Sequence, residues 1–304
     1  MLTRLRNLRA HGALLGANAI YGLNYVIAKG MMPEHFAPRA IIMFRVTGAV
    51  IFFTLLYYFS KKEKVKKRDL IRLAACAVFG IAVNQILFFE GLNLTTPINA
   101  SIIMLIVPIL VMIFSKLLLS EQITANKVIG IVIGLVGATL LILAGGKFSF
   151  RSETFTGNLI VFINAASFGF YLVLVKPMMI RYRAITVMRW LFLFGLLYVT
   201  PFCIGPFLST DFTAIPTRFW FSLMYVIIGT TIIAYILFNY SLKFVSPVVS
   251  SSYLYLQPVI ASLVAISIGM DILNWREGVA AAMVFVGVYF VSIRKNKAIR
   301  KQNG

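Results

Sequence analysis

The chain has 304 residues, of which 60% are hydrophobic and only 12% are charged, and its mean hydropathy is +0.91. Soluble domains contain about 45–50% apolar residues, so this composition excludes a soluble globular protein and predicts an all-α integral membrane protein. The net charge of +20 would suit nucleic acid, but the Lys and Arg residues lie in short segments between apolar runs. We therefore expect the lipid bilayer as a partner and no nucleic acid.

The apolar runs predict ten transmembrane helices, since one crossing takes roughly 20 residues. The predicted spans are 11–31, 38–59, 70–91, 96–118, 125–145, 157–177, 186–207, 219–241, 247–268 and 276–293. The basic opening MLTRLRNLRA resembles the start of a signal peptide. The apolar run behind it is too long for one and lacks a small-residue cleavage site, so we interpret it as a retained first helix.

The basic residues predict the orientation of the spans. If the N-terminus and every second loop are cytoplasmic, that side collects most Lys and Arg residues, including the Lys61–Arg72 group and the tail from Arg294. The opposite side then receives only Lys29, Arg39, Lys147, Arg151, Arg218 and Arg276. Because cytoplasmic loops are enriched in basic residues, we expect both termini in the cytoplasm.

Two stretches of the chain align without insertions: residues 86–108 (ILFFEGLNLTTPINASIIMLIVP) and residues 236–258 (ILFNYSLKFVSPVVSSSYLYLQP). An earlier match pairs Tyr21-Gly22 with Phe168-Gly169. The chain is therefore predicted to be a duplicated five-helix unit. The predicted parts are a first repeat at 1–144, a polar connector at 145–156, a second repeat at 157–293 and a basic cytoplasmic tail at 294–304.

Because five is odd, the second unit must enter the membrane from the opposite side. The expected fold is therefore two five-helix inverted-topology repeats, an architecture that places a solute site near the midplane in many secondary transporters.

The ten spans, the paired Tyr21-Gly22 and Phe168-Gly169, and a turn proline followed by a helix proline in each half resemble the EamA-type permeases of the drug/metabolite transporter superfamily. The resemblance covers about residues 11–293. It implies export of amino acids and other small metabolites without ATP, and a bacterial inner membrane. It does not specify the substrate.

Polar side chains within the spans are expected to face the bundle interior, because lipid cannot satisfy their hydrogen bonds. The predicted substrate-cavity residues are Asn18, Tyr21, Tyr25, Asn84, Gln85, Phe88, Asn164, Ser167, Tyr171, Thr231, Tyr235, Asn239, Ser251, Tyr255 and Gln257. The alternative is that these groups only join helices to one another. We favour a cavity, and its aromatic content favours amphipathic or aromatic solutes.

Two prolines within spans, Pro108 and Pro258, are predicted hinges, because proline removes a backbone hydrogen bond from its helix. Glu90 lies near the outer end of the third span. It is a candidate for proton or ion coupling, and the competing interpretation, which we favour, is a hydrated carboxylate at the headgroup level.

Four basic residues within or at the ends of spans are predicted to snorkel. Arg45 and Arg189 lie within a few residues of a span end, so their long side chains can reach an interface. Lys29 and Lys176 occupy matching ends of the first and sixth spans, and we expect the same of them.

The spans contain no arrangement of metal ligands or nucleophile and base that would support an intramembrane enzyme, so we expect no catalytic residues, metal or cofactor. The sequence favours a secondary transporter of small neutral or zwitterionic solutes that works by alternating access. The alternatives are a sugar-phosphate or nucleotide-sugar transporter, which would need several buried cations, and a membrane receptor or scaffold. A stripe of Gly130, Gly134 and Gly137 would pack helices within one chain or between two, so monomer and homodimer both stay open.

Overall fold

The computed structural model describes residues 2–60, 62–144, 152–267 and 275–293. Every regular element within these ranges is helical. Nine helical stretches in the described chain are long and apolar enough to cross a membrane. The first helix, α1 (Leu2–Met31), completes the bundle, and it carries Asn18 and Asn24 as buried polar side chains.

Ten spans follow one another in the predicted order. The uninterrupted spans are α1, α2 (Pro38–Tyr58), α7 (Ala125–Ala144), α8 (Ser152–Arg181), α9 (Ala184–Leu208) and α14 (Trp275–Ser292). The third span comprises α3 (Lys67–Ala77), the π-helical segment η1 (Val78–Ala82) and α4 (Val83–Leu94). The eighth comprises α10 (Thr217–Met224), the π-helical segment η3 (Tyr225–Ile233) and α11 (Ala234–Leu242). The fourth is α5 (Pro97–Met104) and α6 (Val107–Leu119). The ninth is α12 (Pro247–Ser252), the 3₁₀ turn η4 (Tyr253–Tyr255) and α13 (Leu256–Ser267).

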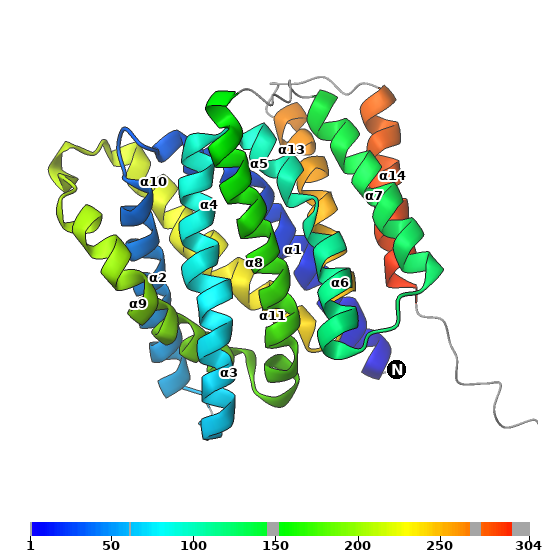
Figure 1. The fold of residues 1–304 in the computed structure, drawn as a ribbon, viewed down its shortest axis with the longest axis horizontal. Helices are drawn as coiled ribbons and strands as arrows, with labels where there is room; N and C mark the ends of the chain where they lie inside the picture. The colour runs from blue at the N-terminus through cyan, green and yellow to red at the C-terminus, as the bar shows by residue number, and fades with distance from the viewer. Residues whose placement is uncertain (1, 61, 145–151, 268–274, 294–304) are drawn as a thin grey trace, which may run out of the picture.

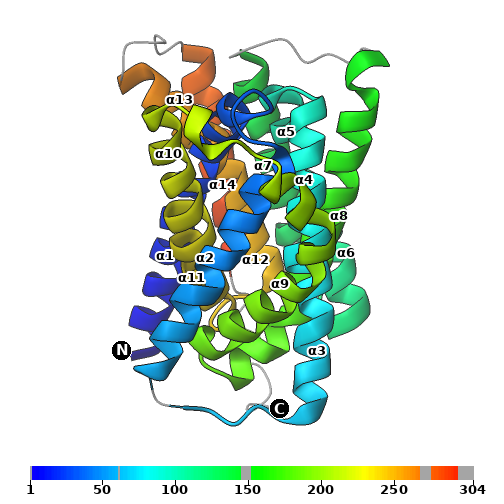
Figure 2. The same cartoon turned by 90° about the vertical axis from the view of Figure 1, so that its left-hand side faces the viewer.

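The helices form a bundle in which the two halves are interleaved (Figures 1 and 2). The most extensive helix pairs are α7 with α14, α2 with α9, α4 with α8, and α1 with α11. Each pair joins one helix of the first half to one of the second. The first helix of each half packs on the third span of the other half. The two contacts are therefore equivalent, as a two-fold axis between the halves requires.

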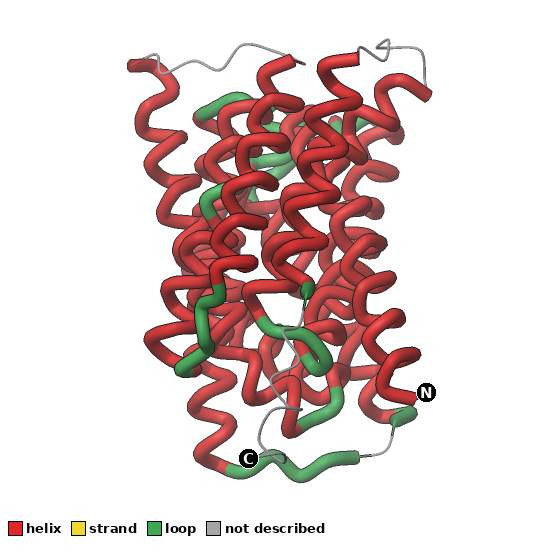
Figure 3. The backbone as a smooth tube through the Cα atoms, turned by 90° about the vertical axis from the view of Figure 1, so that its right-hand side faces the viewer, coloured by secondary structure: helices red, strands yellow, loops and turns green. Residues whose placement is uncertain are grey.

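The direction of the helices fits an inverted repeat. α1 begins at the end of the bundle where α14 finishes, which we call the amino-terminal end (Figure 1). The spans run the height of the molecule, and the described connections lie mainly at its two ends (Figure 3). The fold is therefore an all-α membrane bundle of two five-helix inverted-topology repeats, as the sequence predicted.

Helix interruptions recur at matching places in the two halves. The turn between α5 and α6 directly precedes Pro108, which occupies the first turn of α6. The 3₁₀ turn η4 directly precedes α13, whose first turn contains Pro258. Proline is tolerated there because the first amides of a helix have no helical acceptor. Both predicted hinges therefore lie just after a break in the helical hydrogen bonding, and movement about them remains a prediction.

The glycine stripe packs helices within one chain. A Cβ atom added at Gly130 would lie 2.6 Å from the carbonyl oxygen of Gly287 in α14, and one at Gly137 would lie 2.7 Å from that of Ala280. Only glycine allows the backbones to approach so closely. The stripe therefore joins the last helices of the two halves.

The prediction that Lys29 and Lys176 snorkel to an interface is wrong, because both side chains bind carbonyl oxygens of neighbouring helices. Lys29 Nζ donates to two carbonyl oxygens at the C-terminal end of α4, at 3.0 and 2.7 Å. In the second half, Lys176 Nζ donates to the carbonyl oxygens of Leu242 and Val245 at the end of α11. Helix C-termini carry unpaired carbonyl groups and a partial negative charge, and each lysine caps the third span of its own half.

Candidate functional site

A polar cavity lies where the two halves meet, midway along the bundle. Its wall consists of Tyr21, Asn24, Tyr25, Arg45, Asn84, Gln85, Phe88, Met104, Asn164, Phe168, Tyr235, Leu254 and Gln257. The space open to the centres of water molecules is about 80 Å³, whereas one water needs roughly 10–15 Å³. The cavity therefore has room for a few waters or a small polar group.

The sequence identified much of this wall. The predicted residues that line the cavity are Tyr21, Tyr25, Asn84, Gln85, Phe88, Asn164, Tyr235 and Gln257. The predicted residues that lie outside its wall are Asn18, Ser167, Tyr171, Thr231, Asn239, Ser251 and Tyr255. Most residues of this second group make hydrogen bonds between helices or within one helix. Tyr171, for example, donates to Asn239 Oδ1 at 2.7 Å.

Arg45 of α2 corrects the sequence analysis, because it lies inside the bundle instead of snorkelling. Its side chain is only 5% exposed and lines the cavity. Its Nε donates to Thr231 Oγ1 in η3 at 2.7 Å. Its guanidinium carbon lies 4.9 Å from the centre of the Phe89 ring, a cation–π distance. Arg189, by contrast, lies against the rings of Tyr57 and Trp190, away from the cavity.

Amide groups in the cavity wall have unused hydrogen-bonding capacity. The side chain of Gln85 is only 1% exposed, and neither of its amide atoms has a partner with good hydrogen-bond geometry, although the Tyr235 hydroxyl lies close to it. The side-chain oxygens of Asn24 and Asn164 are likewise buried without a partner. Buried polar groups are normally satisfied, so a concentration of unsatisfied amides in one cavity wall indicates a place for a polar guest.

The π-helical segments contribute polar contacts beside the cavity. A π turn leaves backbone carbonyls without a helical partner. In η1, the carbonyl oxygen of Gly80 accepts from the Tyr235 hydroxyl at 3.1 Å, and that of Phe79 accepts from the Ser167 hydroxyl at 2.8 Å. These bonds connect the third span to the second half directly beside the cavity.

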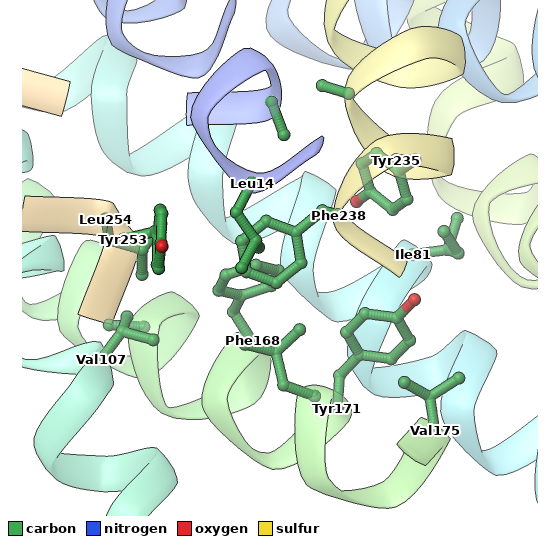
Figure 4. Close-up of a cluster of buried hydrophobic side chains, with 14 of the residues drawn as sticks. Leu14, Ile81, Val107, Phe168, Tyr171, Val175, Tyr235, Phe238, Tyr253 and Leu254 are labelled. Carbon is green, nitrogen blue, oxygen red and sulfur yellow. The ribbon is translucent and has the colours of Figure 1, made fainter. Parts of the chain in front are cut away.

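The cavity is closed toward the amino-terminal end. Leu14, Phe168, Tyr171 and Phe238 converge there from three helices and form what we call the hydrophobic seal (Figure 4). The centre of the Phe168 ring lies 6.2 Å from that of Tyr171 and 6.0 Å from that of Phe238. These buried side chains fill the space between the cavity and that end of the bundle.

Polar contacts reinforce this closure. Gln257 Nε2 donates to Asn18 Oδ1 at 2.9 Å between α13 and α1. Nearer the amino-terminal end, Arg181 Nη1 contacts both carboxylate oxygens of Asp69 at 2.5 and 2.7 Å. The Tyr182 hydroxyl donates to the same carboxylate at 2.7 Å. The two halves are therefore connected by hydrogen bonds and an ion pair on this side.

Toward the opposite end the cavity adjoins a larger space, which we call the vestibule. Its wall consists of Gly22, Tyr25, Val26, Pro97, Ile98, Ser101, Met104, Leu105, Leu141, Ile142, Leu254, Gln257, Pro258, Ala261 and Ser262. Its volume for water centres is about 380 Å³, and Tyr25, Met104, Leu254 and Gln257 line both spaces. The vestibule therefore extends the cavity toward the end of the bundle where α5 begins.

Glu90 lies outside the cavity wall. Its Oε1 accepts from Arg39 Nε at 2.6 Å, and the two side chains are 25% and 44% exposed. Within the described ranges, no group of three His, Cys, Asp or Glu side chains is placed to hold a metal ion.

Five residues of the wall were not predicted from the sequence: Asn24, Arg45, Met104, Phe168 and Leu254. Two had a usable signal. Phe168 is the repeat partner of Tyr21, and Asn24 lies on the same helix face as Tyr21. Met104 and Leu254 line the cavity because they lie beside the breaks before Pro108 and Pro258, and their apolar side chains give no such signal.

A ten-span bundle of inverted repeats around a polar cavity is the architecture of a membrane transporter. A sequence model of the EamA-like transporter family matches residues 8–143 and 155–293, so the chain belongs to this family. The match confirms the resemblance found in the sequence.

Individual relatives support the same class. The uncharacterized transporter YyaM of Bacillus subtilis is 23% identical over 294 residues, which is 95% of each chain. A probable terminal-alkyne amino-acid exporter of Streptantibioticus cattleyicolor is 24% identical over 203 residues, covering 67% of this chain and 66% of that one. A solved crystal structure with 21% identity superposes with a TM-score of 0.72 over 94% of this chain and 95% of the other, which shows a shared fold.

Proposed function

We propose that the protein is a secondary transporter that exports small neutral or zwitterionic metabolites, such as amino acids, by alternating access. The observation that carries this proposal is a polar cavity, built by both repeats, that adjoins a vestibule on one side and a hydrophobic seal on the other. Such a one-sided cavity corresponds to one of the two states of an alternating-access cycle.

The direction of transport depends on the orientation of the bundle. The excess of Lys and Arg in the Lys61–Arg72 group, together with the Arg181–Arg183 turn, favours the amino-terminal end as the cytoplasmic one. Both termini would then be cytoplasmic, in an inner membrane of bacterial type, and the vestibule would lie on the outer side of the cavity. Export is supported by the family resemblance and by the Streptantibioticus relative, which is named as a probable amino-acid exporter.

The cavity favours a small substrate over a large anionic one. Phosphorylated sugars would call for several cations, but Arg45 is the one basic residue in the cavity wall. The narrow cavity, whose wall carries Arg45 and several amide side chains, adjoins a wider vestibule and fits a compact polar group attached to an apolar or aromatic side chain. Tyr21, Tyr25 and Phe88 offer ring surfaces for such a side chain.

Counterflow into proteoliposomes tests the proposal. Liposomes containing the purified protein are loaded with a mixed pool of unlabelled amino acids, and the uptake of each labelled amino acid is measured against protein-free liposomes. The proposal predicts selective uptake of a subset of the pool. Folded protein that transports no amino acid and no other small neutral or zwitterionic metabolite would contradict it.

A further inference from the structure

We propose that Arg45 binds the carboxylate group of the substrate, so that the site selects zwitterionic amino acids over the corresponding amines. This inference rests on the proposed function, because it assigns the chemistry of the same cavity. Arg45 can serve this role because it lies in the cavity wall and not at a membrane interface.

The first argument is the absence of a protein counterion. Arg45 is only 5% exposed, yet no Asp or Glu belongs to the cavity wall. Glu90 of α4 is paired with Arg39 and lies outside the cavity wall. A buried cation without an anion is strongly unfavourable, and a guest that brings its own carboxylate would remove this penalty.

The second argument is the pre-organisation of the guanidinium. Thr231 Oγ1 holds Nε at 2.7 Å, and the Phe89 ring supports the guanidinium at 4.9 Å. Among the described residues Arg45 makes no further hydrogen bond, so its terminal nitrogens remain free to donate. Two parallel N–H donors of a fixed guanidinium match the two oxygens of a carboxylate.

The third argument is the chemistry of the rest of the wall. The unpartnered oxygens of Asn24 and Asn164 are hydrogen-bond acceptors that an ammonium group would satisfy. Arg45 would bind the carboxylate of a zwitterion, and the amide oxygens would bind its ammonium group. A simple amine would find acceptors but would also meet the charge of Arg45, which repels it.

The fourth argument is that the cation has no repeat partner. Gly48 matches Gly195 at an offset of 195 − 48 = 147, and the same offset places Phe192 at the position of Arg45, since 192 − 45 = 147. Phe192 is fully buried and packs on the Tyr235 ring, 5.5 Å between centres. A residue needed only to hold the fold would be expected in both halves, whereas a site for one carboxylate needs one arginine.

The test compares Arg45→Gln, Arg45→Lys and Arg218→Gln in proteoliposomes. Arg218 lies on the ring of Phe219 outside the cavity, so Arg218→Gln controls for loss of charge. The probes are the amino acid with the highest wild-type counterflow, its decarboxylated amine and its deaminated acid, each used as a competitor. We expect the amine to compete at least about tenfold more weakly than the amino acid in the wild type.

Arg45→Gln should weaken competition by the amino acid and by the acid at least about tenfold and abolish their advantage over the amine. Arg45→Lys should retain part of the advantage of the amino acid and the acid over the amine. Arg218→Gln should show the wild-type preference. An Arg45→Gln variant that keeps the wild-type preference would overturn this inference and leave the transporter proposal intact. Absence of transport in the folded wild type would overturn both.

Thermal unfolding separates a binding role from a structural one. If Arg45 serves the substrate, then Arg45→Gln and Arg45→Met should unfold at or above the wild-type temperature, because removing an uncompensated buried charge is not destabilising. The amino acid should raise the unfolding temperature of the wild type but not of these variants. A lower unfolding temperature for both variants, with the substrate-induced rise retained, would show that Arg45 is structural.

Discussion

Gln257 Nε2 lies 2.9 Å from Asn18 Oδ1, so that the start of α13 is hydrogen-bonded to the middle of α1 directly below the cavity. Gln257 also lines both the cavity and the vestibule. One side chain thus contacts the space for the solute and the closure beneath it. This pairing gives a physical route by which an occupied cavity would loosen the closed side.

Removing this bond is expected to weaken the closed side. Asn18→Leu would leave the Gln257 amide without its buried partner, which costs about 1–3 kcal/mol. We expect a lower unfolding temperature in detergent, measured by intrinsic fluorescence. Ser251→Ala is the matched control, because the Ser251 hydroxyl is buried but donates only to a carbonyl within its own helix. Equal stability of Asn18→Leu and Ser251→Ala would contradict the pairing.

The capping lysines are expected to stabilise both halves alike. Lys29→Met and Lys176→Met would each leave helix C-terminal carbonyls unpaired, with an expected loss of about 1–2 kcal/mol in the free energy of unfolding. The measurement is chemical unfolding in detergent, with Lys243→Met as a control on the surface. If Lys29 and Lys176 only snorkel, all three variants will be equally stable.

The contact between α7 and α14 is expected to tolerate no side chain at Gly287. A Cβ atom there would lie 2.5 Å from the backbone nitrogen of Gly134, so Gly287→Val must separate the two helices, with an expected loss of about 1–3 kcal/mol in the free energy of unfolding. Gly205→Ala is the control, because a Cβ atom at Gly205 meets nothing within 4 Å. A Gly287→Val variant with the same free energy of unfolding as the wild-type protein would disprove the close contact.

The helix breaks are expected to matter for the rate of transport. The double variant Pro108→Ala, Pro258→Ala would favour continuous fourth and ninth spans and stiffen the elements beside the cavity. We expect initial counterflow to fall about tenfold, equivalent to ~1.4 kcal/mol in the barrier, while the substrate-induced rise in unfolding temperature persists. Unchanged rates would remove the hinge role from both prolines.

Glu90 is expected to contribute little. Its ion pair with Arg39 is partly exposed, and such pairs contribute about 0–1 kcal/mol. Glu90→Gln should therefore leave the unfolding temperature and any dependence of uptake on a pH gradient nearly unchanged. Loss of gradient dependence in this variant would establish Glu90 as a coupling residue instead.

The spans and the repeat could be predicted from the sequence because they depend on local and periodic patterns. Hydropathy gives the spans, and the aligned prolines give the duplication. The π-helical segments could not be predicted in this way, since a segment such as η1 makes contacts with distant residues, for example the Tyr235 hydroxyl that binds the Gly80 carbonyl. Propensity carries no information on such partners.

The candidate site was predictable in part, because periodicity gives the face of a helix but not the depth of the cavity. Asn18, Tyr21 and Tyr25 share a face, yet Asn18 lies one turn below the wall. Arg45 shows a second limit. Its distance from the span end suggested snorkelling, whereas Thr231 and Phe89, distant in sequence, hold it inside.

The most direct test of alternating access is the accessibility of the two sides of the cavity. In a background with Cys76→Ser and Cys203→Ser, single cysteines are introduced as Ser262→Cys in the vestibule wall and Leu14→Cys in the hydrophobic seal. The rate of alkylation is measured with and without the amino acid found by counterflow. The account predicts fast labelling at 262 and slow labelling at 14, with the substrate shifting the two rates in opposite directions. Labelling rates that a transported substrate leaves unchanged at both positions would contradict it.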